Sequence, residues 1–385
     1  MHPTLQNTEY KVHIQEINCF EQLSAHRLQW RRLLESTPDV TFFHTPEWLQ
    51  VYWKHFGHDK RLRVLLAYDG SQLVGVVPLM VATEATRAGK LRFLTYVHGH
   101  WGTMFGPVGP EPQAVLTAGL EHILAMPRDW DALEIRWAHA GDYDFLASRR
   151  PLPSLRGPLC RSVHEYTSLV DLHGTWEAYL AGRTSKWRNN LKRWKRRIAE
   201  LGEVEYLRYR PRGDAHNDAD PRWDLYEDCL AVTRGSWQSG STDGSSLLHA
   251  DVHEYFRDAH LAAVRAGALD LNLLYADGRP LAFVYNYRHG GRLMSLRVGY
   301  DAASSRSGAG NVLYAHVIED SFRRGDVVYD LGPGSVDCKR HLRTELRPLY
   351  RYSHFPVRSL RPNILRLKRL LDGWRSADAV DEQAA

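Results

Sequence analysis

The sequence predicts an α/β protein built from two copies of one unit, and three observations support this class. Strand-like and helix-like patterns alternate along most of the chain. Residues 62–78 and residues 271–285 both show a strand, an Asp-Gly turn and a returning strand. Each hairpin is followed by a third strand, a glycine-containing loop, a helix and a further strand. Because these elements recur in the same order, we expect a duplicated unit of about 170–190 residues per copy.

Composition and charge are those of an ordinary soluble globular protein. The chain has 385 residues, of which 43% are hydrophobic and 25% charged, so two or three domains are expected. The net charge of +5 permits anionic ligands and does not require nucleic acid. We expect no membrane span, because no apolar run approaches ~20 residues. We expect no signal peptide, because the first residues lack a charged region and an apolar core. The four cysteines are scattered, which argues against a zinc site or a disulfide framework and favours a cytoplasmic location.

The first half begins with a strand at residues 11–17 and a helix that follows it. Thr45 and Pro46 predict the N-cap and first residue of a second helix. The aromatic residues of this helix either line a cleft or form core, and the core interpretation is favoured. Beyond the hairpin we expect, in order, a strand at residues 91–97, a helix at 114–125, a strand at 132–137 and a connection between the halves at 138–163.

The second half contains the clearest helix of the chain, at residues 184–201. Its apolar residues recur at steps of four and three, Thr184 or Ser185 can cap it, and Gly202 can end it. Its other faces carry a run of basic residues: Arg183, Lys186, Arg188, Lys192, Arg193, Lys195, Arg196 and Arg197. Such a run is either a solvated face or a surface for an anionic substrate, a tRNA or polysaccharide precursor, or an acidic partner. The other elements expected here are strands at residues 166–172, 205–209, 269–275, 280–287 and 292–300 and helices at 224–234 and 251–266.

A glycine loop at residues 305–310 precedes a helix that Gly325 ends, and a short strand at 327–329 follows. The start of such a helix offers free backbone N–H groups and a positive dipole end, which suit a phosphate. The spacing is neither the dinucleotide-binding GxGxxG nor a P-loop. The candidate cofactor-binding residues are Ser305, Arg306, Ser307, Gly308, Ala309, Gly310, Asn311 and Tyr314.

The loop at the same position of the first half, residues 105–112, differs in composition. It contains three prolines, each of which removes one N–H donor. We therefore expect only the C-terminal half to hold a phosphate-bearing cofactor. The first half is then structural or closes one side of a shared cleft.

Short motifs occur in a defined order over residues 10–355. They lie at residues 45–48, 68–78, 176–180, 185–193, 236–238, 277–282, 299–301, 307–308 and 329–332 and at Lys339. The Ser-x-x-Gly-x-Gly spacing from Ser305 to Gly310 also resembles the GNAT pyrophosphate loop, although that family prefers Gln or Arg where Ser305 stands. Together these motifs resemble the tandem-GNAT acyltransferases of the BioF2-like (CelD/BcsL-type) group, which are related in architecture to the FemAB-type aminoacyl transferases.

The resemblance implies an α/β (α+β) fold with two GNAT-like domains in tandem, each a mixed, mostly antiparallel sheet flanked by helices. We expect an N-terminal domain at residues 10–163, a C-terminal domain with the donor site at 164–356, and a basic amphipathic helix with a disordered tail at 357–385. The implied reaction moves an acyl group from acyl-CoA, acetyl or longer, to an amine or hydroxyl of a small-molecule, sugar-derived or amino-acid-derived acceptor.

The candidate catalytic residues follow from the chemistry of a thioester. A thioester is already activated, so the protein mainly holds donor and acceptor together and removes a proton. The candidate general bases are Asp330, Asp337 and His341, with Asp330 favoured because it ends the strand after the loop and helix. An equally strong interpretation makes Asp330 a turn carboxylate before a glycine. Tyr300 and Tyr314 are candidate proton donors to the sulfur.

The candidate acceptor-binding residues are Trp237, Gln238, Lys339 and Arg188. The first two could equally form a packed helix end, and Lys339 could pair with a neighbouring acid. His98 and His100 flank a glycine but lack a third ligand at metal-site spacing, so no metal is expected.

Three hypotheses of function stay open at this point. The leading one is an acyl-CoA-dependent acyltransferase. The second uses aminoacyl-tRNA as donor, which the basic helix favours. The third is a non-catalytic binding protein with degenerate GNAT folds, which Ser305 in place of Gln or Arg keeps open.

The C-terminal segment at residues 363–374 predicts a basic amphipathic helix. It could pack on the body of the protein, mediate a dimer or touch an anionic surface, and packing is the favoured interpretation.

Overall fold

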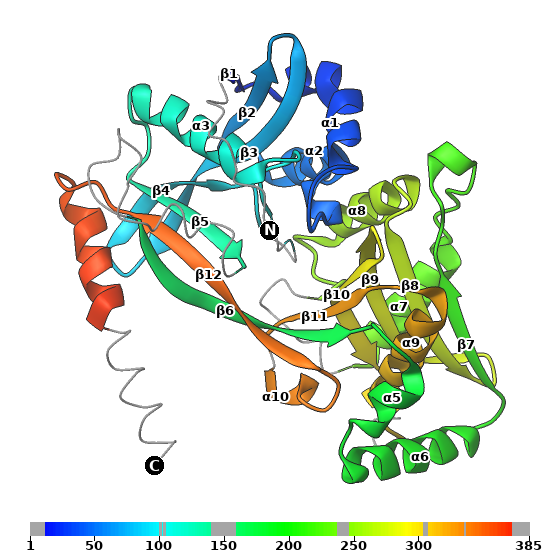
Figure 1. Cartoon of the computed structure of the whole chain (residues 1–385). Coiled ribbons are helices and arrows are strands. Elements are labelled where there is room, and N and C mark those ends of the chain that lie inside the picture. The colour runs from blue at the N-terminus through cyan, green and yellow to red at the C-terminus, as the bar shows by residue number, and fades with distance from the viewer. Residues whose placement is uncertain are drawn as a thin grey trace, which may run out of the picture.

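A computed structural model of the chain describes residues 12–99, 102, 105–139, 159–236, 246–302, 307–334 and 336–371. A single twelve-stranded sheet runs through the molecule in the order β1-β2-β3-β4-β5-β12-β6-β11-β10-β9-β8-β7 (Figure 1). The two halves of this order mirror each other, because each has four antiparallel strands, then a parallel neighbour, then an antiparallel one.

The first half of the sheet contains β1 (His13–Ile17), β2 (Arg61–Asp69), β3 (Gln72–Thr86), β4 (Gly89–Tyr96), β5 (Ala132–Ala138) and β12 (Glu345–His354). The second half contains β7 (Val204–Tyr209), β8 (Leu269–Ala276), β9 (Arg279–His289), β10 (Arg292–Tyr300), β11 (Val328–Pro333) and β6 (Cys160–Asp171). Most strands run as alternating or fully apolar segments, as strands buried on one or both faces require, whereas β12 and the first part of β6 do not.

The centre of the sheet joins the two halves by exchange of strands. β12 comes from the end of the chain, yet it pairs with β5 of the first half on one side and with β6 on the other. The β6–β12 pair is antiparallel and extends from Cys160 to Leu169, so the two halves share one continuous ladder. The expected boundary at residue 163 falls inside β6. The domain limits given above stay a prediction.

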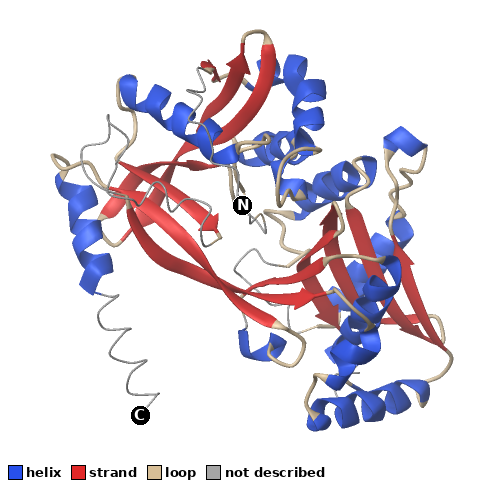
Figure 2. Ribbon diagram, in the orientation of Figure 1, coloured by secondary structure: helices blue, strands red, loops and turns tan. Residues whose placement is uncertain are grey.

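Helices cover the faces of the sheet in both halves (Figure 2). In the first half these are η1 (Phe20–His26), α1 (Arg27–Leu34), η2 (Phe42–His44), α2 (Pro46–Phe56) and α3 (Pro112–Ala125). In the second half they are α5 (Trp176–Ala181), α6 (Ser185–Ala199), η3 (Asp214–His216), α7 (Trp223–Arg234), α8 (His253–Arg265), α9 (Ala309–Arg324) and α10 (Val336–Lys339). A last helix occupies residues 360–371.

The helices α3 and α9 occupy corresponding places. Each follows the fourth strand of its half, packs on the second and third strands, and leads into the parallel strand. The helices α5 and α6 pack beside α9, whereas α7 lies against β9 and β10. The large core continues across both halves, where Phe42 packs edge-on against Tyr287 with ring centroids 4.6 Å apart.

The halves also meet through their helices. α2 packs on α8, where Asp258 accepts hydrogen bonds from Lys54 at 2.5 Å and pairs with His55 at 2.7 Å. Phe56 packs against Tyr255 in the same contact. The side chains of α2 in the first half therefore pack directly on those of α8 in the second half.

The structure confirms the predicted α/β fold with its duplicated, mostly antiparallel unit. The predicted cap of α2 is present, since the Thr45 hydroxyl accepts a hydrogen bond from Trp48 N–H. Thr184 caps α6, and the left-handed Gly325 ends α9. The sequence reasoning did not predict β12, and it treated the first residues of β6 as a connection.

Candidate functional site

The start of α9 has the features of an anion site. Gly308 precedes the helix with φ of +75°, a conformation that favours glycine. A Cβ atom at this position would lie 2.4 Å from Cγ of Trp194, so the α6 tryptophan seals the loop against any side chain. The first turn of α9 carries no acidic residue and receives no side-chain cap. Its N–H groups and dipole therefore favour an anion.

Two tyrosines stand near this helix start. Tyr300 ends β10 and lies close to Gly310, where an added Cβ would be 3.3 Å from its ring. The Tyr314 hydroxyl, one turn further along α9, lies 3.2 Å from the Ser295 hydroxyl on β10. Burial raises the pKa of Tyr314 to about 12, so its hydroxyl stays protonated and can donate a hydrogen bond.

The strands β10 and β11 form a short parallel ladder. Only three residue pairs are registered, from Arg292–Val328 to Met294–Asp330. Directly after this ladder, the register of β10 against β9 shifts between Ser295 and Arg297. A bulge turns a strand away from its neighbour. The ladder between β10 and β11 therefore ends at Asp330.

Asp330 is a buried carboxylic acid with uncharged partners. Its Oδ1 accepts hydrogen bonds from the Thr167 hydroxyl on β6 and, at 2.8 Å, from the Gly332 N–H. Burial raises the pKa of Asp330, and these two hydrogen bonds oppose the rise only in part. Among the described residues, Asp330 forms no ion pair. A buried carboxyl with a raised pKa is suited to accept a proton near neutral pH.

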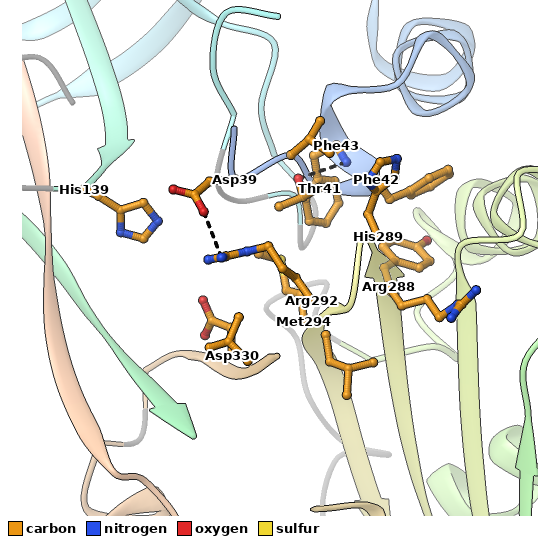
Figure 3. A pocket seen from close by; sticks show the side chains of 14 residues that line it. Asp39, Thr41, Phe42, Phe43, His139, Arg288, His289, Arg292, Met294 and Asp330 are labelled. Atoms are coloured by element: carbon orange, nitrogen blue, oxygen red, sulfur yellow. Dashed lines mark hydrogen bonds and ion pairs between the residues drawn. The ribbon is translucent and has the colours of Figure 1, made fainter. Parts of the chain in front are cut away.

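A pocket opens beside Asp330, between the two halves of the molecule. The first half contributes the segment from Asp39 to Phe43 and His139 at the end of β5. The second half contributes residues 287–289 and 292–294 of the β9–β10 hairpin together with Val328 and Asp330. Figure 3 shows Asp39, Arg292, His139 and Asp330 around one common space, with an Asp39–Arg292 ion pair of 2.8 Å across it.

The wall from Asp39 to Phe43 is held in a fixed conformation. His44 and Thr41 form a reciprocal cap, in which the Thr41 N–H donates to His44 Nδ1 at 3.1 Å. Trp30 Nε1 donates to the His44 carbonyl at 2.9 Å. Burial lowers the pKa of His44 to about 4, which keeps this histidine neutral as an acceptor. The pocket wall is therefore preorganised.

The strand pattern places Tyr314 and Asp330 on opposite faces of the sheet. Ser295 faces α9, since it meets Tyr314, and its neighbour Met294 lines the pocket with Asp330. Successive side chains of a strand point to opposite faces. A molecule at the start of α9 and a molecule in the pocket can therefore meet where the β10–β11 ladder ends.

The other candidate bases lie outside this pocket. Asp337 is exposed on α10, and His341 is exposed just after it. Lys339 instead donates three hydrogen bonds to the backbone carbonyls of Gly332, Pro333 and Gly334, at 2.8, 2.9 and 3.0 Å. Burial lowers the pKa of Lys339 to about 8, although Asp330 favours the charged form. Lys339 thus holds the turn that follows Asp330.

Arg188 also contacts backbone carbonyl groups. It donates to Ala181 at 2.8 Å and to Arg183 at 3.1 Å, which satisfies the carbonyl end of α5. Four predicted residues, Ser305, Arg306, Trp237 and Gln238, lie outside the described residues. Ser307 is buried directly before Gly308. The structure thus brings Ser307, Gly308, Ala309, Gly310, Asn311 and the two tyrosines together, with Asp330 on the other face.

Sequence reasoning missed most of the pocket. The polar pocket residues that it did not single out are Asp39, Thr41, His139, Arg288, His289 and Arg292. It also missed Thr167, whose hydroxyl donates to Asp330. The aromatic cluster before α2 was a partial signal, because Phe42 and Phe43 are both buried core and pocket lining. Nothing in their spacing pairs them with a strand about 250 residues further along the chain.

Within the described residues, no group of three His, Cys, Asp or Glu side chains could hold a metal ion. No helix in that part of the chain is both long and apolar enough to span a membrane.

Comparisons with known proteins agree with this architecture. Residues 185–340, from α6 to the end of α10, match the family model described as an acetyltransferase (GNAT) domain. No curated protein matches the sequence. The structure is similar to a crystal structure of FemX, with a TM-score of 0.57 and 12% identity over 92% of this chain and 99% of that one.

Two further solved structures are similar over most of their length. One is the C-terminal domain of a putative lysylphosphatidylglycerol synthetase from Agrobacterium fabrum, with a TM-score of 0.52 and 11% identity over 86% of this chain and 92% of that one. The other is L-PGS from Bacillus licheniformis, with a TM-score of 0.50 and 15% identity over 89% and 96%. At these identities the likeness is one of fold. The chain therefore has a GNAT-like fold, as expected, whereas its placement in the BioF2-like group stays a prediction.

Proposed function

We propose that this protein is an acyltransferase that moves an acyl group from acyl-CoA to an amine or hydroxyl acceptor by direct attack on the thioester. The observation that carries the proposal is the position of Asp330, a buried acid without an ion-pair partner among the described residues, at the end of the β10–β11 ladder. The end of this ladder adjoins α9 on one face of the sheet and the pocket on the other face.

The donor would bind on the α9 side. Its phosphates would accept hydrogen bonds from the first N–H groups of α9, at Ala309, Gly310 and Asn311, with Ser307 and Gly308 shaping the loop. The basic face of α6 adds positive charge close by, because Trp194 of α6 packs on Gly308.

The acceptor would bind in the pocket between the halves. The acceptor amine itself attacks the carbonyl carbon of the thioester. Its N–C bond forms as the C–S bond to CoA breaks, and the acyl group is never bonded to the protein. Asp330 takes the proton that the amine loses, and the Tyr314 hydroxyl supplies a proton to the departing thiolate, with Tyr300 as the alternative donor. Holding both reactants and accepting the proton are the protein's main tasks for an activated donor.

The composition of the pocket suits a polar acceptor with a negative group. His289 and Arg292 line it, and Nδ1 of His289 is a buried polar atom without a partner among the described residues. Burial lowers the pKa of His289, which a bound anion would reverse. The four cysteines are free, so we place the reaction in a reducing compartment, the cytoplasm.

A second candidate donor is an aminoacyl-tRNA. The observation in its favour is α6, whose exposed residues are mostly Arg and Lys and whose first turn has no acid. A surface of this kind binds a nucleic acid backbone with strong dependence on salt. With this donor Asp330 would again accept the proton of the acceptor, because the ester between the amino acid and the tRNA is also an activated acyl donor.

The test measures melting temperature with acyl-CoA and, separately, with aminoacyl-tRNA, on the parent and two variants. Asn311→Asp places a carboxylate in the first turn of α9, where it repels a phosphate. Gln113→Glu places the same charge in the first turn of α3 as a matched control. We expect acyl-CoA to raise the melting temperature of the parent and the control, and to raise that of Asn311→Asp much less.

Stabilisation by aminoacyl-tRNA alone would favour the second donor. No shift with either donor would contradict the proposal and favour a non-catalytic binding protein. Equal shifts in the parent and in Asn311→Asp would contradict the placement of the donor at α9.

A further inference from the structure

The C-terminal helix, residues 360–371, has one face fixed to the protein. Leu365 is buried in a small core with Leu91, Phe93 and Phe355. Arg369 NH1 donates to Glu134 Oε2 at 2.5 Å, and Lys368 Nζ donates to the Arg87 carbonyl at 2.6 Å. The helix is therefore an integral part of the first half, as the favoured prediction had it.

The opposite face of the same helix is apolar and exposed. Leu360 is 78% exposed, Ile364 39%, Leu367 59% and Leu371 46%. These positions are spaced by four, three and four residues, so they lie within about 60° of one another around the helix. The stripe faces roughly 130° away from Leu365. Val357 and Leu370 extend the exposed apolar surface.

Packing against the first half therefore explains only the Leu365 face of the helix and not its exposed apolar face. Four large apolar side chains in one exposed row are unusual for a soluble protein, and such rows mark interaction sites. In Figure 1 the helix, drawn in orange-red, lies at the edge of the molecule beside β4 and β12, where a flat surface could approach it.

The charges around the stripe indicate what covers it. Residues 357–371 contain five Arg or Lys and no Asp or Glu. Arg361 and Arg366 flank the stripe on its two sides by helical geometry, and Arg358 precedes it. All three are exposed. A second copy of this helix would bring like charges together, whereas an anionic lipid surface offers an apolar interior beneath a negative headgroup layer.

The dimensions of the helix agree with a position in the plane of the surface. Twelve residues make a helix of about 18 Å, well short of the ~30 Å hydrocarbon core. A row of leucines flanked by arginines is typical of helices that lie in the interface with the apolar face inward.

We propose that the C-terminal helix docks the protein onto the surface of an anionic membrane, with Leu360, Ile364, Leu367 and Leu371 inserted and Arg358, Arg361 and Arg366 among the headgroups. This inference does not depend on the proposed function, since it concerns a face of the first half away from Asp330. It would place the protein beside a membrane without a membrane-spanning segment.

The test is co-sedimentation of the full chain with two kinds of vesicle, phosphatidylcholine alone and phosphatidylcholine mixed with phosphatidylglycerol. We expect binding to the mixed vesicles to exceed binding to phosphatidylcholine by about 10- to 100-fold and to weaken in high salt. Leu367→Ser/Leu371→Ser should lower binding at least tenfold, and Arg361→Gln/Arg366→Gln should remove the preference for the anionic lipid.

The matched control is Leu28→Ser/Leu201→Ser, which removes two leucines that are 68% and 48% exposed on other helices or their ends. It should bind as the parent does. Because all the replaced side chains are exposed, each variant should keep the melting temperature of the parent.

Two results would overturn the proposal. One is failure of the parent to bind mixed vesicles, or equal binding by the parent and Leu367→Ser/Leu371→Ser. The other is a dimer in sedimentation velocity that the same double variant abolishes, since a second copy would then cover the face.

Discussion

Each half of the molecule buries one carboxylate on the strand that follows its sheet-covering helix, and the two carboxylates have opposite surroundings. Glu134 lies on β5 after α3, and Asp330 lies on β11 after α9. Glu134 contacts Arg136 at 2.5 Å, Arg369 at 2.5 Å and Arg351 at 4.0 Å. Asp330 contacts a hydroxyl and a backbone N–H instead.

The pKa values of the two groups follow from these partners. Burial raises the pKa of both carboxyl groups. In Glu134 the three arginines outweigh burial and lower the pKa to about 2, whereas in Asp330 burial dominates and the pKa is raised. An ionised, ion-paired carboxylate is structural, whereas a carboxyl that forms no ion pair among the described residues is suited to exchange its proton. We therefore propose that the same fold position serves stability in one half and chemistry in the other.

The helix starts show the same division. In the first half the loop before α3 lies on β3, where Val76 and Val108 exchange two backbone hydrogen bonds of 2.9 and 2.7 Å. The next N–H, of Gly109, donates to the Thr37 hydroxyl at 2.9 Å. These donors are therefore occupied by the protein itself. Neither helix start receives a side-chain cap, so the difference lies in the residues that precede each helix. The left-handed Gly308 precedes α9, whereas Glu111 and Pro112 stand at the start of α3, where a carboxylate and a missing N–H suit an anion less well.

The largest expected effect comes from Asp330→Asn. Without a proton acceptor, the turnover of acyl transfer should fall by about 10²–10⁴-fold. The melting temperature should change little, because the amide can still accept from Thr167 and Gly332 and the native site already favours a neutral group. The measurement is thiol release from acyl-CoA under saturating donor. Unchanged turnover would remove Asp330 from the mechanism.

The pH dependence of kcat/KM gives a second test of Asp330 as the general base. A general base must be ionised, so kcat/KM of the parent should fall as the pH is lowered through the raised pKa of Asp330, above the ordinary value of 3.8. Asp330→Asn should lose this limb of the profile. Because the folded pKa is raised, ionising Asp330 costs stability, and the parent should become slightly less stable as the pH rises through that range.

Glu134→Gln tests the structural role proposed for the carboxylate of the first half. Removing one charge from a buried cluster leaves Arg136 and Arg369 without a full partner, which should cost about 3–5 kcal/mol of unfolding free energy. The folded pKa of about 2 is below the ordinary 4.5, so this stabilisation is complete above pH 4.5 and is lost as the pH falls toward 2. Chemical denaturation at several pH values measures it. A constant difference between parent and variant from neutral to acid pH would contradict this explanation.

The smallest expected effect distinguishes the two ends of α9. Gly308→Ala and Gly325→Ala both place a side chain at positive φ, of +75° and +72°, which costs about 1–2 kcal/mol. At Gly325 an added Cβ meets nothing within 4 Å, whereas at Gly308 it meets Trp194. Only Gly308→Ala should therefore weaken the binding of acyl-CoA. Equal affinities in calorimetry would show that the loop does not hold the donor.

The repeated hairpins could be predicted from the sequence, because each depends on residues that are close in the chain. The same local reasoning proposed the glycine loop and Asp330 as site residues, and these roles stay predictions. It did not predict β12, whose residues Arg347, Pro348 and Arg351 interrupt an apolar alternation. The partners of β12 lie on β5 and β6, roughly 180–220 residues earlier, and only tertiary pairing makes it a strand.

The pocket could not be predicted for a related reason. Asp39 and Arg292 come from different halves and meet only after the halves pack. Lys339 and Arg188 were sensible candidates as isolated cations, yet both satisfy backbone carbonyls of nearby turns. Local patterns indicate the chemistry of a residue, whereas the packing of distant segments determines what that residue contacts.

The most direct test of the division between the halves is amide hydrogen exchange with and without acyl-CoA. The two segments to compare are residues 307–314 at the start of α9 and residues 108–116 at the start of α3. We expect acyl-CoA to slow exchange in the first segment and to leave the second unchanged, because the proposed donor site lies at the start of α9, whereas the loop before α3 uses the N–H groups of Val108 and Gly109 within the protein and Pro112 at the start of α3 has no N–H. Protection at the start of α3, or at neither helix, would contradict the assignment of the donor site to the C-terminal half.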